Sequence, residues 1–291
     1  MPIKTSKTAS SKDLPYSSIS PEIAQRFRDR ALAIPFYARV IALQPSHPIV
    51  GAGLQEHSVV FDDPFGRAVR TTQALISQIY QDPEELGKQI RAWHKDVKGT
   101  DTSGKAYHAL DPVPWAWVHY SAFDAILYAL KTMGRLPDRD TQEIMYREWK
   151  IGGKFLGVKP QLTPDSFADF EDYIQTTIQD DLTATDNLRS LWDYLDHVPL
   201  SALPGVPKLA GKLAQQPLAH AGKVLIGHAL PKNLRGELGI KWGMPESLQH
   251  EALMMTLKTT NAALPESVRV WPESLGKSGT GFTLAPRAQA A

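Results

Sequence analysis

Residues 113–130 read VPWAWVHYSAFDAILYAL and form the most apolar long run of the chain. His119, Asp124 and several small residues interrupt this run, and an uninterrupted membrane span does not normally contain such groups. Gly134 follows where a helix of this length would end. The run therefore predicts a buried helix over 113–133 in a globular protein, with no integral membrane segment.

The flanking sequence carries many helix start and stop signals. The strongest start is Asp82-Pro83-Glu84-Glu85, where a capping side chain and an N1 proline precede two acids at the positive end of the helix dipole. Gly99 is predicted to end that helix. Residues 100–112 are predicted to be a loop, and no helix is predicted in the glycine-containing stretch 46–63. Further helices are predicted over 21–44 with a kink at Pro35, 64–80, 139–151, 164–180, 184–196, 206–229 and 245–260.

These signals predict an all-α fold, built as a single globular multi-helix domain over residues 16–265. Residues 1–15 are rich in Ser, Thr and Lys and are predicted to be a disordered N-terminal tail. Residues 266–291 have a similar composition and are predicted to be an irregular C-terminal tail. Neither an internal repeat nor a shift in composition marks a second domain.

The composition excludes several classes of function. Of the 291 residues 42% are hydrophobic and 22% charged, and the net charge of +1 gives no reason to expect a nucleic-acid partner. Cysteine is absent, which excludes disulfides, thiolate metal sites, iron–sulfur clusters and covalently attached haem. The N-terminus has no apolar core of the kind a signal peptide needs, so a cytoplasmic location is expected. Motifs for phosphate loops, dinucleotide folds, zinc proteases and serine hydrolases are also missing.

His94 is the first candidate for a functional residue. Four residues of the predicted helix lie within a narrow arc, namely Leu86, Ile90, Trp93 and Val97, and His94 of IRAWHKDVKG (90–99) lies at the edge of this arc. A single histidine on an apolar face is more often a hydrogen-bonded core residue than a ligand. On its own, this pattern leaves both interpretations open.

A succession of sequence blocks favours a functional role. In order, these blocks are LQPSHPIVGAGLQEHS (43–58), DPFGRAVRTT (63–72), RAWHKDVKG (91–99), GKAYHALDPVPWAWVHY (104–120), YREWKIGGKFLG (146–157) and LPKNLRGELGIKWG (230–243). The succession resembles the MpaB-like oxygenase family, which includes the latex-clearing proteins that cleave polyisoprene. The resemblance extends from about residue 25 to about residue 260, which is most of the chain.

The resemblance implies an all-helical protein that binds haem b (iron protoporphyrin IX) without a covalent bond. His94 would be the axial iron ligand, and Arg67, Arg70 and Thr71 would form the second family signature on the preceding helix. In rubber-cleaving relatives, a lysine at the position of Arg70 can occupy the distal side of the iron. Arginine is a very poor iron ligand, so Arg67 and Arg70 are expected to bind propionates or to steady an anion derived from dioxygen. A surface ion-pair face is the alternative for these two arginines.

Two more histidines are candidates for the same pocket. The resemblance places His57 and His119 near the cofactor, although capping or packing would also explain either residue. The function this implies is a haem b-dependent oxygenase that activates dioxygen on a His-ligated iron and acts on a hydrophobic small molecule such as an alkene or a terpenoid side chain. One alternative is a zinc or non-haem metal hydrolase or cyclase, with His94, His119 and either His57 or Asp124 as ligands. The other is a non-catalytic binder of haem or of a hydrophobic ligand.

Overall fold

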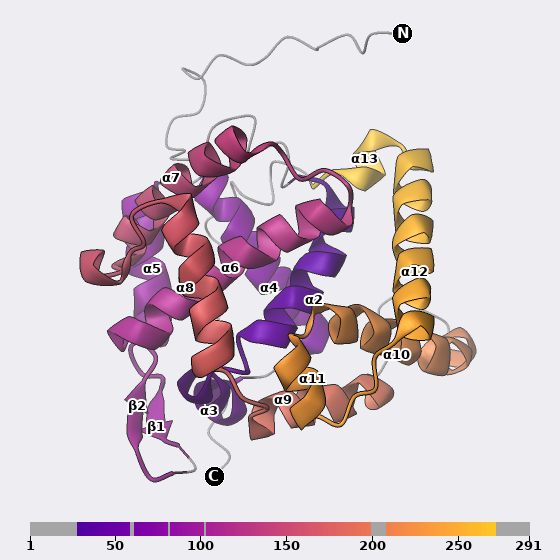
Figure 1. The fold of residues 1–291 in the computed structure, drawn as a ribbon, viewed down its shortest axis with the longest axis horizontal. Helices are drawn as coiled ribbons and strands as arrows, with labels where there is room; N and C mark the ends of the chain where they lie inside the picture. Colours follow the sequence, from indigo (N-terminus) through magenta and orange to yellow (C-terminus); the bar gives the residue numbers. More distant parts are fainter. Residues whose placement is uncertain (1–27, 59–60, 81, 102, 199–207, 272–291) are drawn as a thin grey trace, which may run out of the picture.

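The computed structural model describes residues 28–271 apart from 59–60, 81, 102 and 199–207. This part of the chain is a single all-α domain, as predicted (Figure 1). It also contains one small two-stranded sheet, which was not predicted. Its elements are η1 Arg30–Leu32, α2 Ala33–Leu43, α3 Pro48–His57, α4 Pro64–Tyr80, α5 Pro83–His94, β1 Lys98–Thr100, β2 Ala106–His108, α6 Pro112–Thr132, α7 Arg139–Leu156, η2 Pro160–Leu162, α8 Phe167–Asp180, α9 Asp186–Tyr194, η3 Leu195–His197, α10 Lys208–Ala229, α11 Lys232–Glu237, α12 Met244–Ala263 and α13 Glu266–Arg269.

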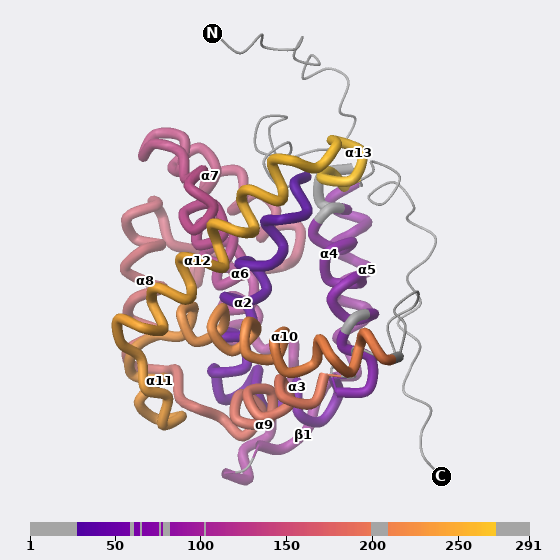
Figure 2. The backbone as a smooth tube through the Cα atoms, turned by 90° about the vertical axis from the view of Figure 1, so that its right-hand side faces the viewer, coloured from indigo at the N-terminus to yellow at the C-terminus, as the bar shows by residue number. Residues whose placement is uncertain are grey.

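The central helix is α6, which contains the apolar run of the sequence. Trp117, Tyr120 and Phe123 on this helix are at most 1% exposed. Helix α2 runs along α6 (Figure 2). Helices α7 and α8 pack against α6 through a cluster of aromatic rings that includes Tyr146. Burial of each large apolar side chain contributes roughly 1.5–3 kcal/mol relative to exposure. The aromatic layer around α6 is therefore the core that holds the other helices in place.

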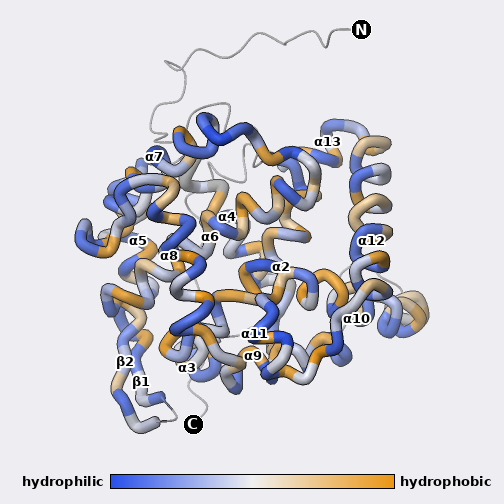
Figure 3. Tube along the Cα trace, viewed as in Figure 1, coloured by the Kyte–Doolittle hydropathy of each residue, from blue (hydrophilic) through white to orange (hydrophobic). Residues whose placement is uncertain are grey.

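Hydropathy along the chain follows this arrangement. Hydrophobic positions recur through α2, α6 and α10, whereas hydrophilic positions predominate on the outer elements such as α11 and the β1–β2 hairpin (Figure 3). None of the helices in the described ranges is long and apolar enough to cross a bilayer. Helix α6, whose 113–130 run is interrupted by polar residues, is a core helix, as predicted.

Side chains cap the starts of several helices. The side chain of Asp138 accepts a hydrogen bond from the backbone N–H of Thr141 at the start of α7, and Thr185 accepts one from Leu188 at the start of α9. Ser166 forms a capping box with Asp169 at the start of α8. These helices begin within a few residues of the predicted positions.

The N-terminal helix differs from its prediction. Residues 21–27 lie outside the described residues, and the described part starts with the 3₁₀ turn η1, whose first N–H groups are capped by Asp29. Helix α2 follows directly, with Pro35 in its first turn, where a proline removes no intrahelical hydrogen bond. A 3₁₀-to-α junction therefore replaces the predicted kink.

The stretch 46–63 contains a helix that was not predicted. Pro48 is the N1 residue of α3, and Gly51 lies where a Cβ would be 2.5 Å from the Pro45 carbonyl oxygen and 2.9 Å from the Thr185 hydroxyl oxygen. Only glycine allows this approach of α3 to the start of α9. Gly51 therefore serves helix packing.

The predicted end of the helix at 83–98 and the predicted loop at 100–112 are both wrong. Helix α5 ends at His94, and Gly99 pairs with Tyr107 in the β1–β2 hairpin. Tyr107 is 4% exposed, and its hydroxyl donates a hydrogen bond to Glu56 at the end of α3. This contact between distant parts of the chain stabilises the hairpin, and local sequence signals do not report it.

The predicted tails fall largely outside the described residues. Residues 1–15 and 272–291 are not described, so these boundaries stay predictions. Within the described part, Glu266–Arg269 form α13, and Val270 pairs with Asp29 in an isolated β-bridge.

Candidate functional site

His94 is the last residue of α5, and its ring orientation is fixed by the helix itself. Nδ1 donates a hydrogen bond of 2.7 Å to the carbonyl oxygen of Ile90, one turn earlier. Burial lowers the pKa of His94, so the imidazole is neutral at pH 7. With its proton on Nδ1, a neutral ring keeps the lone pair on Nε2. No described residue is hydrogen-bonded to this Nε2, which leaves the nitrogen able to bind a metal.

Trp115 holds the other side of the His94 ring. The two rings meet edge to face, with centroids 5.2 Å apart. The indole N–H of Trp115 donates to the Leu156 carbonyl oxygen at the end of α7, which fixes the indole in turn. The His94 ring is therefore positioned by α5, α6 and α7 together.

Arg67 of α4 is a cation whose charge acts on the His94 ring. Its charge contributes to lowering the pKa of His94, after burial, and it also acts on Tyr37. Burial and the charge of Arg70 lower the pKa of Arg67 itself, although the guanidinium remains charged. Among the described residues, no carboxylate forms an ion pair with Arg67. A partly buried guanidinium that no described carboxylate pairs is suited to an anionic ligand, because an isolated charge is costly to desolvate.

Arg70 and Thr71 are arranged differently from Arg67. Arg70 forms an ion pair of 2.9 Å with Asp63, and this interaction lowers the pKa of the Asp63 carboxyl. Asp63 also accepts a hydrogen bond from the Gly66 N–H in the first turn of α4. Thr71 donates its hydroxyl to the Arg67 carbonyl oxygen at 3.0 Å. Arg67 therefore acts on His94 through its charge, whereas the Arg70 side chain is engaged by Asp63.

Tyr37 of α2 is a site residue that sequence reasoning missed. Its hydroxyl lies 2.7 Å from the Ala68 carbonyl oxygen and 2.6 Å from the Thr72 hydroxyl, so it joins α2 to α4 next to Arg67. Burial raises the pKa of Tyr37 to about 12. The only signal in the sequence is a phenol within a mainly apolar helix, and this does not reveal its partner.

We expect Tyr37→Phe to loosen α4. The change removes a hydroxyl that bonds both Ala68 and Thr72, at a cost of about 1 kcal/mol. Hydrogen exchange measured by mass spectrometry should become faster over α4. Tyr107→Phe is the matched control, since it removes a hydroxyl of the β1–β2 hairpin that is bonded to Glu56 of α3. Equal exchange of α4 in Tyr37→Phe and the parent protein would contradict the role assigned to this hydroxyl.

His119 lies in the core between α6 and α7. Its ring stacks on Trp149 with centroids 5.1 Å apart, and a Cβ at Gly153 would come within 2.6 Å of its Nε2. Burial lowers the pKa of His119 to about 4, and Nε2 has no hydrogen-bond partner among the described residues. The space that a ligand on this Nε2 would need is occupied by the α7 backbone.

The burial of His119 predicts a loss of stability in acid. The unfolded chain takes up this proton near pH 6.5 and the folded chain only near pH 4, so stability is complete above pH 6.5 and falls as the pH drops toward 4. A shift of this size corresponds to about 3 kcal/mol. Urea unfolding between pH 7 and pH 4.5 measures it. His119→Gln should flatten the pH dependence relative to His57→Gln at the exposed position, and equal slopes would contradict this assignment.

His57 is at the surface, at the end of α3. Its Nε2 lies 3.1 Å from the Lys98 carbonyl oxygen of β1, in an exposed position. None of its described interactions reaches the His94 ring. The structure therefore associates His57 with the hairpin.

The ligand set of the zinc hypothesis does not converge. The described residues contain no group of three or more His, Asp or Glu side chains that could hold a metal ion. Asp124, one of the predicted alternatives, forms an ion pair of 2.7 Å with Arg39. A single imidazole with a cation nearby is suited to a cofactor that brings its own ligands, and does not resemble a protein-ligated zinc site.

The chain is similar to one known protein family. A family model described as ER-bound oxygenase mpaB/B′/rubber oxygenase, catalytic domain, matches residues 25–259, a range that includes α2 to α11 and most of α12. Neither the curated proteins nor the solved structures contain a significant match. The matched range is most of the chain and includes Arg67, Arg70, Thr71 and His94. The chain therefore belongs to the mpaB/rubber oxygenase family, and it carries the catalytic domain of an oxygenase, an oxidoreductase.

Proposed function

We propose that this enzyme is a haem b-dependent oxygenase that acts on a hydrophobic small molecule. The observation that carries the proposal is the state of His94: a buried, neutral imidazole whose Nδ1–H is bound to the Ile90 carbonyl oxygen and whose Nε2 is available. Proximal haem histidines need this tautomer, with the second nitrogen fixed by a backbone carbonyl or a carboxylate.

The donor set fits haem b. Nε2 of His94 would bind the iron, and the guanidinium of Arg67 supplies a cation for a propionate or for another anion at the iron. Bound haem would supply the activation of dioxygen and the redox chemistry. A thiolate-ligated centre is not an option, because the chain has no cysteine.

The remaining chemistry falls to the side chains of the site. The Ile90 carbonyl holds the proton at Nδ1, and Trp115 keeps the ring oriented and shielded from water. Arg67 would stabilise negative charge that develops on oxygen, at a position where low polarity strengthens the interaction. The guanidinium of Arg70 is held in its ion pair with Asp63 and is not expected to bind the iron.

The substrate follows from the family and from the chemistry. The family description includes rubber oxygenase, and rubber is a polymer of alkene units. An alkene or a terpenoid-like side chain is therefore the proposed substrate, with dioxygen as co-substrate. The Arg67 guanidinium is directed to the cofactor in this proposal, so recognition of the substrate itself would rest on apolar contacts.

Oxygen isotope labelling tests the reaction. Haem-loaded enzyme is incubated with isoprenoid alkenes of different length under ¹⁸O₂, and the products are analysed by mass spectrometry. The proposal expects oxygenated products that contain ¹⁸O, and none from a His94→Ala preparation. Haem-loaded enzyme that consumes no dioxygen with any alkene offered would support the alternative of a haem-binding protein without catalysis.

A further inference from the structure

Two histidines outside the site stack on each other between α10 and α12. The ring centroids of His228 on α10 and His250 on α12 are 3.6 Å apart, and the ring planes differ by 2°. His250 is 5% exposed, and its Nε2 is buried without a hydrogen-bond partner among the described residues. Face-to-face rings at this distance pack well when both are neutral, whereas two imidazolium ions would repel each other.

Aromatic rings and a cation surround the pair. Nδ1 of His228 is hydrogen-bonded to the Tyr128 hydroxyl at 2.7 Å, and the edge of His228 faces Trp242 with centroids 6.0 Å apart. The guanidinium of Arg39 lies over the Tyr128 ring, 5.5 Å from its centroid. The pair is therefore enclosed by aromatic rings, with a cation directly behind Tyr128.

The charged groups that face the pair come from four helices. They are Arg39 of α2, Asp124 and Tyr128 of α6, Arg235 of α11, and Glu251 and Lys258 of α12. Asp124 is paired with Arg39 at 2.7 Å, and Glu251 is exposed, so neither compensates a proton on the stacked rings well. Burial, Arg235 and Arg39 lower the pKa of His228. Burial, His228 and Lys258 lower the pKa of His250 to about 4.

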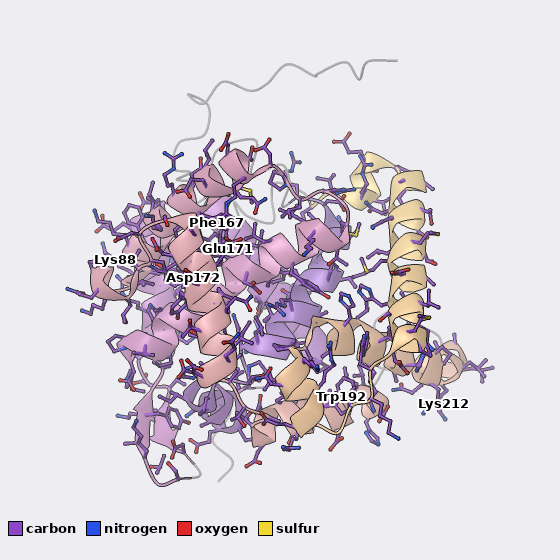
Figure 4. The ribbon with its side chains drawn as sticks, viewed as in Figure 1. Lys88, Phe167, Glu171, Asp172, Trp192 and Lys212 are labelled. Carbon is purple, nitrogen blue, oxygen red and sulfur yellow. The ribbon has the colours of Figure 1, made fainter. Side chains whose placement is uncertain are left out.

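Helix α12 has few other anchors to the body of the protein. It lies on the outside of the bundle, on the side toward which α10 extends with Lys212 (Figures 1, 2 and 4). Its buried side chains are His250, Met254 and Asn261, and Asn261 donates to Asp29 at 3.0 Å. Met244, Leu248 and Met255 on its outer face are more than half exposed. The stacked pair is therefore a large part of what holds this helix.

We propose that His228 and His250 form an acid-released latch: the neutral rings hold α12 against α10, and protonation of the pair separates the two helices. The inference is independent of the haem and goes beyond the proposed function. It also has a route to the site, because Arg39 faces the latch from α2 while Tyr37, two residues earlier, is hydrogen-bonded to α4.

Hydrogen exchange of the full chain at pH 7.5 and pH 5.0, corrected for the intrinsic pH dependence of exchange, tests the latch. The protection factors of peptides that cover 244–263 should fall at least about tenfold at pH 5.0, because proton uptake by the pair favours the open form. Peptides of α8, over 167–180, report the global loss of stability that the buried His119 predicts, so the α12 result is judged against the same peptides in His250→Phe. Protection of α12 that stays within threefold across this pH range would overturn the proposal.

Variants assign the effect to the pair. His250→Phe keeps an aromatic partner for His228 but cannot be protonated, so the response of α12 to acid should disappear. His228→Asn is the second variant if His250→Phe does not fold, because asparagine still offers a group to the Tyr128 hydroxyl. His220→Phe is the matched control: His220 also joins α10 to α12, through Gln249 at 2.9 Å, but it is exposed. Loss of the response in His220→Phe, or its persistence in both latch variants, would also overturn the proposal.

Discussion

Replacing His94 with alanine is expected to lower the haem affinity of the enzyme by more than about 100-fold, since loss of groups that merely orient a metal ligand already costs 10–100-fold. His94 supplies the only protein–iron bond in this account. The side chain is at the end of α5, and its one hydrogen bond among the described residues lies within its own helix, so its removal should leave the helices intact. Haem content is measured by the pyridine haemochrome and helicity by far-ultraviolet circular dichroism.

Two further preparations make the result specific. His197→Ala removes an exposed ring that bonds only to the preceding turn, and should retain full haem content. His94→Gly with added imidazole should regain the haem absorption, because free imidazole can enter the vacated space and bind the iron. Full haem content in His94→Ala would show that another group binds the iron.

The second large effect is expected for Gly87→Ala, which should lower the free energy of unfolding by about 2 kcal/mol. A Cβ at Gly87 would lie 2.2 Å from the Phe155 carbonyl oxygen and 2.8 Å from its carbonyl carbon. These are backbone atoms of α7, so α5 has to move away from α7 as a whole, at a cost of roughly 1–3 kcal/mol or more. The better helix propensity of alanine returns only about 1 kcal/mol.

Urea unfolding and haem titration together measure the consequence. The displacement of α5 also moves His94 away from Trp115, which is fixed to Leu156 of α7. Haem affinity should therefore fall along with stability. Gly236→Ala is the control, since nothing lies within 4 Å of a Cβ at that helical position. Unchanged stability in Gly87→Ala would show that α5 and α7 are less tightly coupled than the structure indicates.

The fold could be predicted where the signal was local. The apolar run around Trp117 and the capping residue Asp82 depend on neighbours within a turn or two, and the corresponding helices are present. Helix α3 and the β1–β2 hairpin were missed because distant residues stabilise them. Gly51 packs against Thr185, and Tyr107 bonds to Glu56.

The site was predictable in part, for the same physical reason. The resemblance to the oxygenase family singled out His94 and Arg67, and the structure relates them through electrostatics. It could not show that Asp63 engages Arg70, or that Tyr37 joins α2 to α4, because these partners come from the surrounding loop and from another helix. His119 shares its helix face with Trp115, yet only the packing against Gly153 reveals it as a core residue.

The central claim is that His94 holds haem iron, and the absorption spectrum of the purified enzyme, with its iron and zinc content, tests this most directly. The account predicts a strong Soret band and close to one iron per chain after expression with added haem precursor. A colourless protein that binds no added haem and contains stoichiometric zinc would contradict it.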